Sequence, residues 1–213
     1  MGENSKHTTS RAELKQRIIR VSLHYFQDRG IKAITMDEIA TSLGISKRTL
    51  YEVFADKEAL LMACLQHSQE EGEQYIYKVY KEARNVLEVI LSVFQFSIRR
   101  VHETNKKFFE EIKKYPSAHE MLRRRSNSDN EKTIAFFRQG VEQGVFRSDV
   151  NFAIVTVLVK EQMNLLVNSD LCKEYSFLEV YESIMFTFLR GISTAKGAQE
   201  LEAFIREYRS NNE

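Results

Sequence analysis

The apolar residues near the start of the chain repeat with the period of an α-helix. They follow one another from Leu14 to Tyr25 at spacings of four, three and four, which predicts a helix over residues 11–29. Gly30 ends the pattern, as expected of a residue that takes a left-handed conformation after a helix. The ten residues before this helix are polar and are predicted to form a disordered tail.

Two short helices are predicted next because their start signals are complete. Thr35 and Glu38 occupy the two positions of a capping box, in which each side chain satisfies a free amide of the first turn. This signal predicts a helix over residues 36–43. Ser46 is an N-cap residue for a second short helix over residues 47–53.

The spacing within this segment is typical of a helix-turn-helix. Counted from Met36, a small residue, Ala40, is fifth, where the second helix would cross the first. Gly44 is ninth, in the tight turn, and Leu50 is fifteenth, where an apolar side chain would anchor the second helix. Residues 36–53 are therefore interpreted as a helix-turn-helix.

The rest of the chain continues as a series of helical patterns. The chain has one proline and eight glycines, too few turn residues for a strand-rich protein of 213 residues, so we predict an all-α fold. The predicted helices cover residues 57–80, 83–103, 105–114, 117–125, 128–143, 152–168, 176–193 and 198–209.

Charge, apolar run length and cysteine content limit the possible compartments and partners of the protein without identifying its function. The net charge of +1 gives no strongly basic field, so charge by itself leaves DNA binding undecided. The longest apolar run, residues 152–159, is too short to span a membrane, and no signal-peptide core is present near Met1. Two cysteines suit a reducing compartment, so a cytoplasmic protein without membrane partners is expected.

The second helix of the motif carries the candidate DNA-binding chemistry. A recognition helix enters the major groove with its first residues toward the base edges, and here these are Lys47, Arg48 and Thr49. Lysine and arginine donate to guanine, and the methyl group of threonine packs on that of thymine. Phosphate contacts are expected from three hydroxyl groups, those of Thr35, Ser46 and Tyr51. The alternative is a solvated helix face without a ligand.

The segment "ITMDEIATSLGISKRTLYEVFADKEAL" resembles the N-terminal signature of TetR-family transcriptional regulators. The resemblance is specific over residues 11–65, and "GVEQGVFRSDVNFA" is a weaker match to the segment before the dimerisation helices of that family. It implies phosphate contacts from Thr35, Tyr51 and Lys57, with base contacts from Lys47, Arg48 and Thr49. Val53 departs from the family pattern, in which many members have an aromatic residue or a histidine.

The resemblance also implies a domain organisation and partners. A helix-turn-helix DNA-binding domain at residues 1–56 would precede a helical effector-binding and dimerisation domain at residues 57–213. The expected partners are a double-stranded DNA operator, a small-molecule effector of unknown identity and a second copy of the chain. The usual effect of such a regulator is repression that the effector relieves.

Two helices near the end of the chain are candidates for the dimer interface. The patterns at 152–168 and 176–193 are apolar on more than one face, as expected of helices with several neighbours. Burial of both helices within one protomer is an equally open explanation. The candidate interface residues are Val155, Val159, Leu166, Tyr181, Met185, Phe188 and Ile192.

Phenylalanines that lie after residue 60 are candidates for an apolar effector cavity, although an aromatic residue is more often part of a core. These residues are Phe94, Phe96, Phe108, Phe109, Phe136 and Phe137. Cys64 and His67 lie three positions apart, but two ligands do not make a metal site, so no metal or other cofactor is expected.

Three functional classes remain from the sequence. The favoured one is a DNA-binding regulator that responds to a small molecule. The second is a helix-turn-helix dimer without such an effector. The third, an enzyme or carrier built on a helical bundle, is disfavoured because the chain has no paired Glu-x-x-His motifs and no Gly-x-Ser-x-Gly motif.

Overall fold

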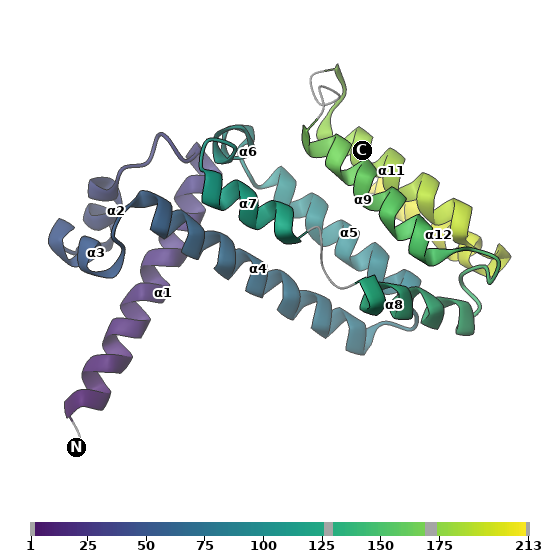
Figure 1. Cartoon of the computed structure of the whole chain (residues 1–213), viewed down its shortest axis with the longest axis horizontal. Coiled ribbons are helices and arrows are strands. Elements are labelled where there is room, and N and C mark those ends of the chain that lie inside the picture. The colour runs from purple at the N-terminus through teal and green to yellow at the C-terminus, as the bar shows by residue number, and fades with distance from the viewer. Residues whose placement is uncertain (1–2, 126–129, 169–173, 212–213) are drawn as a thin grey trace. The chain divides into compact units, whose positions relative to one another are not determined.

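The computed structural model describes residues 3–125, 130–168 and 174–211 (Figure 1). The description leaves out the side chains of residues 3–10, 119, 122–125, 130 and 163–168. The described residues form eleven α-helices and no strand, which confirms the predicted all-α class. None of these helices is long and apolar enough to cross a membrane.

The chain forms two compact units, each made from two stretches of sequence. Unit 1 combines the residues up to Tyr75 with residues 99–125, and unit 2 combines residues 76–98 with the residues from 126 onward. The boundary predicted after residue 56 is therefore not the boundary between the compact units. It stays a prediction about functional domains.

Unit 1 contains the predicted helix-turn-helix and the helices that support it. Its helices are α1 (Glu3–Arg29), α2 (Met36–Leu43), α3 (Lys47–Val53), the first part of α4 (Lys57–Glu82), the end of α5 (Val86–His102), α6 (Lys106–Ile112) and α7 (Pro116–Arg125). Helix α1 begins at Glu3, eight residues before the predicted start. Residues 3–10 are therefore helical, whereas a disordered tail was predicted there. The added segment contains no glycine or proline that would interrupt a helix.

The predicted turns between the first helices are confirmed by their backbone angles. Gly30 after α1 has a φ of 87°, and Gly44 after α2 has a φ of 66°, both in the left-handed region that favours glycine. The capping box at Thr35 is only half formed. Thr35 accepts from the Glu38 amide, whereas the Glu38 carboxylate accepts from Arg29 Nη1 at 2.6 Å.

The core of unit 1 joins the N-terminal helices to α6 and α7. Phe26, Ile39 and Leu50 are fully buried in it. Phe108 and Ile112 of α6 and Ala118 of α7 fill the same core, although they lie more than fifty positions after α3. The helix-turn-helix is therefore packed against residues from much later in the chain.

Unit 2 is a bundle around a second core. Its helices are the remaining parts of α4 and α5, with α8 (Asn130–Glu142), α9 (Phe152–Asn168), α11 (Phe177–Ile192) and α12 (Ala195–Ser210). Most predicted boundaries are confirmed to within a few residues. Asn151 caps α9, because its Oδ1 accepts from the Ile154 amide at 3.3 Å.

Gly197 gives a direct test of the packing in unit 2. A Cβ atom at this buried position would collide with the backbone carbonyl oxygen of Val145, which has no side-chain freedom to move away. We expect Gly197→Ala to lower the free energy of unfolding by about 1–3 kcal/mol. Gly191→Ala is the matched control, because a Cβ at Gly191 meets nothing within 4 Å. Thermal unfolding followed by circular dichroism distinguishes the two, and equal melting temperatures would contradict this packing.

Candidate nucleic-acid interface

The start of each short helix is fixed by a hydroxyl side chain. Thr35 Oγ1 accepts from the Glu38 amide at 3.1 Å, and Ser46 Oγ accepts from the Thr49 amide at 3.0 Å. Leu50, on the opposite side of α3, is fully buried and anchors the helix in the core. These contacts leave the first turn of α3 at the surface.

Two arginines of α1 hold the other ends of the short helices. Arg17 Nη2 donates to the carbonyl oxygen of Leu43 at 2.5 Å, at the end of α2. Arg11 Nη2 donates to the carbonyl oxygen of Glu52 at 3.3 Å, near the end of α3. A cation is favourable at a helix C-terminus, where carbonyl groups lack helical partners. Sequence reasoning missed both contacts, since nothing local in α1 indicates them.

Lys47 forms an ion pair within the motif. Its Nζ lies 2.8 Å from Asp37 Oδ1 and 3.0 Å from Asp37 Oδ2, so the pair links α3 to α2. The hydrogen bond with Asp37 raises the pKa of Lys47. Both side chains are largely exposed, and an exposed pair is worth only about 0–1 kcal/mol. Lys47 therefore exchanges partners at little cost.

Arg48 lies on the exposed face of α3. Its side chain is 90% exposed, and its Nε donates to Glu52 Oε1 at 3.0 Å, one turn further along the helix. An arginine in this position is available to donate two hydrogen bonds to an external acceptor. Thr49, the next predicted contact, is half-buried and shares a 2.8 Å hydrogen bond with Ser46 Oγ.

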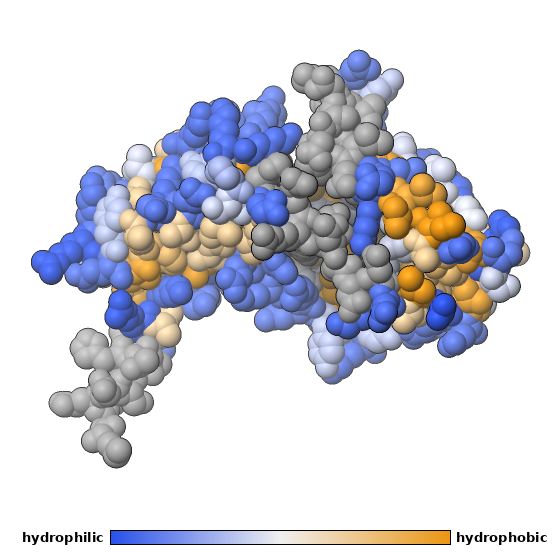
Figure 2. Space-filling view, viewed as in Figure 1, coloured by the Kyte–Doolittle hydropathy of each residue, from blue (hydrophilic) through white to orange (hydrophobic). Residues whose placement is uncertain are grey.

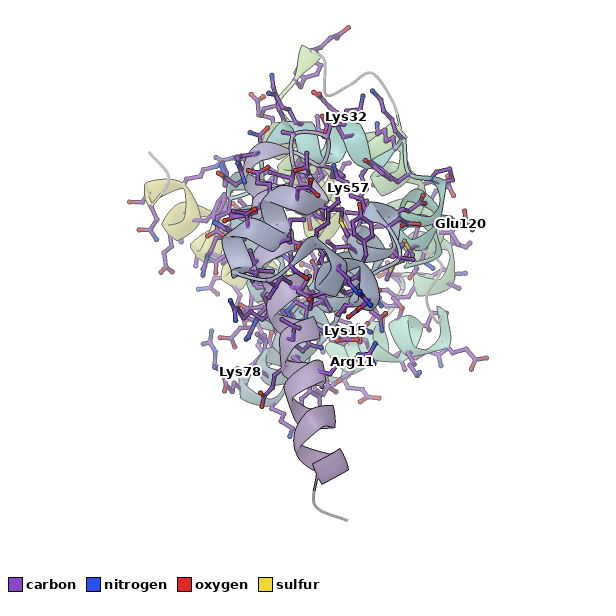
Figure 3. The ribbon with its side chains drawn as sticks, turned by 90° about the vertical axis from the view of Figure 1, so that its left-hand side faces the viewer. Arg11, Lys15, Lys32, Lys57, Lys78 and Glu120 are labelled. Atoms are coloured by element: carbon purple, nitrogen blue, oxygen red, sulfur yellow. The ribbon has the colours of Figure 1, made fainter. Side chains whose placement is uncertain are left out.

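An open depression of about 420 Å³ lies beside this helix face. Its lining combines cationic and hydroxyl groups with two carboxylates and two apolar side chains, contributed by Lys32, Ile34, Thr35, Met36, Asp37, Lys47, Tyr51, Asp56 and Lys57. Figure 3 shows Lys32 and Lys57 on the end of unit 1 that carries α2 and α3. Three of the residues predicted to contact phosphate therefore surround one hollow: Thr35, Tyr51 and Lys57.

Lys57 differs from the other cations in being half-buried. Asp56 Oδ1 caps α4 by accepting from the Ala59 amide at 2.7 Å, which places Lys57 at the first position of that helix. Its Nζ lies 5.9 Å from the centre of the Phe26 ring. Burial lowers the pKa of Lys57, while the carboxylates of Glu111 and Glu38 act in the opposite direction.

The six phenylalanines predicted to line an effector cavity are divided between the two units. Phe108 fills the core of unit 1, and Phe109 in the same unit is exposed. Phe94 and Phe137 are buried in the packed core of unit 2, with Phe136 half-buried against it. Phe94, Phe108 and Phe137 thus follow the alternative interpretation, in which they are core residues. Phe96 is half-buried in unit 2, and the effector site stays a prediction.

The predicted interface residues lie mostly against the protomer's own core. Val155, Tyr181, Met185 and Phe188 pack partly buried on the core of unit 2, and Ile192 is buried in that core. Their assignment to an interface stays a prediction. Val159 is half-buried, and the side chain of Leu166 lies outside the described residues.

A different face of α9 is apolar and exposed. Ile154, Val157 and Leu158 are 58%, 48% and 56% exposed, and Figure 2 shows hydrophobic surface over this part of unit 2. The sequence pattern predicted that this helix is apolar on more than one face, but periodicity does not show which of these faces the protomer covers. The dimer interface stays a prediction.

Cys64 is a core residue of unit 1. Its Sγ donates to the carbonyl oxygen of Ile19 at 3.4 Å, and burial strongly raises the pKa of the thiol, which disfavours the reactive thiolate. Among the described residues, no group of three potential metal ligands lies together. The geometry gives Cys64 a packing role.

Comparison with known proteins relates this geometry to a family. The sequence profile of a family described as bacterial regulatory proteins, tetR family, matches residues 18–64, which include α2 and α3. The uncharacterized HTH-type transcriptional regulator YerO of Bacillus subtilis (strain 168) is 44% identical over 55 residues, which cover 26% of this chain and 19% of that protein. The likeness to YerO is thus confined to a fifth of its length.

Two further similarities extend over most of the chain. The HTH-type transcriptional repressor KstR2 of Mycolicibacterium smegmatis is 22% identical over 155 residues, covering 70% of this chain and 76% of that protein. The solved structure of a TetR-family transcriptional regulator from Marinobacter aquaeolei VT8 has a TM-score of 0.67 at 17% identity. The structural match covers 91% of this chain and 98% of the Marinobacter aquaeolei protein. At this identity, the structural likeness concerns the fold.

Proposed function

This chain belongs to the TetR family of bacterial regulatory proteins, and from this premise we propose that it is a sequence-specific DNA-binding transcriptional regulator. In this proposal it acts in the cytoplasm as a homodimer. The two copies of α3 enter successive major grooves of a pseudo-palindromic operator. The proposal describes a binding protein rather than an enzyme.

The observation that carries the proposal is the exposed first turn of α3. Lys47 and Arg48 stand there beside a hollow bordered by the hydroxyl groups of Thr35 and Tyr51. Cationic side chains at the start of a recognition helix read base edges, and flanking hydroxyl groups and amides position the helix on phosphates.

The carboxylates of the free protein explain how these cations are held before DNA binds. Asp37 and Glu52 pair with Lys47 and Arg48 in weak, exposed contacts. DNA phosphates and guanine acceptors would replace these carboxylates as partners. In the free protein, the two carboxylates hold the cationic side chains close to α3. Replacement of the carboxylates by DNA acceptors favours sequences that offer an acceptor to both cations.

The regulatory part of the proposal is repression that a small molecule relieves. The relative KstR2 is named a transcriptional repressor, and a large second unit is available to bind an effector. An effector that binds better to the form unable to hold DNA would lower operator affinity. A coupling of about 1–3 kcal/mol corresponds to a decrease of roughly 5–150-fold.

Selection of bound fragments from sheared DNA of the source genome tests the proposed function. The fragments retained by the full chain would be sequenced, and the best one would be footprinted. A protected inverted repeat is the expected result, and its neighbouring genes would suggest effectors to test. Failure to enrich any fragment, even at low salt where phosphate contacts are strongest, would contradict DNA binding.

Lys57 is expected to contribute affinity without sequence preference. Lys57→Ala should weaken binding to every duplex and reduce the slope of log affinity against log salt by about 0.9 for each phosphate contact that the substitution removes. Fluorescence anisotropy at several salt concentrations measures this slope. Lys78→Ala, which removes an exposed lysine of unit 2, is the charge-matched control. An unchanged slope in Lys57→Ala would show that this residue does not contact DNA.

A further inference from the structure

Helix α6 is attached directly to the turn between α1 and α2. Asn105, which caps α6, donates from its backbone amide to the Gln27 carbonyl oxygen at 2.7 Å and from Nδ2 to the Asp28 carbonyl oxygen at 3.1 Å. Near the other end of α6, Glu111 Oε2 accepts from the backbone amide of Lys32 at 2.7 Å. Both ends of this helix are thus hydrogen-bonded to the residues that lead into the helix-turn-helix.

The turn and α6 also lie in close contact at Gly30. A Cβ atom on Gly30 would stand 3.0 Å from Lys107 Cβ and 3.1 Å from Glu111 Oε2. Because Gly30 also has a positive φ, this position favours glycine for two independent reasons. The carboxylate of Glu111 therefore lies against the turn as well as accepting a hydrogen bond from it.

The hydrogen bond from Lys32 to Glu111 fixes the backbone of the turn. Lys32 lies between α1 and α2, so its amide belongs to neither helical hydrogen-bond ladder. Hydrogen bonds to an ionised acceptor are shorter and stronger than those between neutral groups. Glu111 is half-buried, which reduces competition from water for this acceptor. One carboxylate of α6 thus holds the main chain at Lys32.

Lys32 is an exposed residue that lines the depression beside α3 (Figure 3). The other two lysines of this depression are less available. Lys47 pairs with Asp37 at 2.8 Å, and Lys57 is half-buried with its Nζ 5.9 Å from the centre of the Phe26 ring. In the described part of the chain, no carboxylate forms an ion pair with the ammonium group of Lys32. Lys32 thus brings an exposed positive charge to the depression.

We propose that Lys32 binds a DNA backbone phosphate, and that Glu111 positions Lys32 for this contact by accepting from its backbone amide. This inference rests on the proposed function. A lysine binds phosphate as a compact point charge, and a fixed backbone reduces the freedom that is lost when the side chain binds. Thr35 and Lys57, for which phosphate contacts are already proposed, line the same depression.

The charge of Glu111 allows its positioning role to be separated from simple electrostatics. A carboxylate near a DNA phosphate repels it, so loss of this charge alone should strengthen DNA binding. Glu111→Gln and Glu111→Met both remove the charge and have similar sizes. The glutamine keeps an oxygen that accepts from the Lys32 amide, whereas the methionine offers only a weakly accepting sulfur. A difference in DNA affinity between these two variants therefore reports the hydrogen bond.

The first test compares Lys32→Gln with the unsubstituted full chain and with Lys78→Gln. Affinity for a random-sequence DNA duplex and for the selected operator would be measured over a series of KCl concentrations. Lys32→Gln should reduce the salt slope by about 0.9 per phosphate contact removed, or about 1.8 for a dimer, on both duplexes. Lys78→Gln removes the same charge from an exposed position of unit 2 and should leave the slope unchanged.

The second test compares operator binding by Glu111→Met and Glu111→Gln. Glu111→Met should bind roughly 2–10-fold more weakly than Glu111→Gln, a range that corresponds to one hydrogen bond. The difference should disappear when both substitutions are made in the Lys32→Gln chain, because Glu111 acts on DNA through Lys32. A merely structural role of Glu111 would leave the difference unchanged in that chain.

The outcomes separate this proposal from the proposed function. Equal slopes for Lys32→Gln and Lys78→Gln, with operator binding by the unsubstituted chain, would overturn the Lys32 contact and leave the regulator intact. Equal operator affinities of Glu111→Met and Glu111→Gln, or a difference that persists in the Lys32→Gln chain, would overturn the positioning role. If the unsubstituted chain bound neither duplex, this proposal and the proposed function would both fail.

Discussion

Replacing Phe94 with alanine is expected to lower the free energy of unfolding by about 3–5 kcal/mol. Phe94 is 1% exposed and stands at the centre of an aromatic cluster in unit 2. Its ring centroid lies 5.1 Å from that of Phe186, 5.3 Å from that of Tyr181 and 5.5 Å from that of Tyr208. The substitution would remove both the buried area of the ring and these ring interactions, and would leave a cavity.

Urea denaturation followed by circular dichroism measures this effect. Phe109→Ala removes the same atoms from a side chain that is 42% exposed in unit 1, so it should cost much less. Similar decreases in the two variants would contradict the packing described for unit 2. A small decrease in Phe94→Ala together with tighter effector binding would instead favour the predicted effector cavity at this residue.

Arg48→Ala is expected to have the largest effect on sequence recognition. Removal of each base contact should cost about 1–3 kcal/mol, and a dimer has two such contacts on one operator. The structural reason is that Arg48 is 90% exposed on the first turn of α3, where the surface carboxylate of Glu52 is its partner in the free protein. Competition binding with operators changed at single positions measures both the affinity and the preference.

The pattern of weakened sequences identifies the kind of contact that Arg48 makes. If Arg48 reads a base, the variant should lose its preference at one position of each half-site while keeping the others. Lys57→Ala is the contrasting variant, because removal of a phosphate contact weakens binding to all sequences equally. Uniform weakening by Arg48→Ala would show that Arg48 contacts the backbone and would contradict its assignment to a base.

Local chemistry explains which features of the fold were predictable. Caps and turn glycines act within a few residues, so Ser46 and Gly44 predicted helix ends that the structure confirms. The spacing within 36–53 likewise identified the helix-turn-helix, which is now part of unit 1. The early start of α1 was missed because polar residues 3–10 carry no apolar stripe to indicate a helix.

Features that depend on distant contacts were not predictable in the same way. An apolar residue has the same pattern whether it fills a core, lines a cavity or awaits a partner, so Phe108 was assigned to a cavity and Ile192 to an interface. The contacts of Arg11 and Arg17 with carbonyl groups also depend on tertiary placement. The exposed first turn of α3 was predictable because its cations fall at the start of the second helix of a helix-turn-helix, where a recognition helix faces the bases.

The sharing of one core between the helix-turn-helix and α6–α7 limits how this protein can be rearranged by evolution. A fragment ending at residue 56 would lack Leu60 and Leu61 of α4 and also Phe108, Ile112 and Ala118, and its remaining apolar residues would face water. A DNA-binding segment taken from another regulator would have to match these distant side chains in size and shape. New operator preferences are therefore expected to arise by substitution on the exposed face of α3 rather than by exchange of the whole motif.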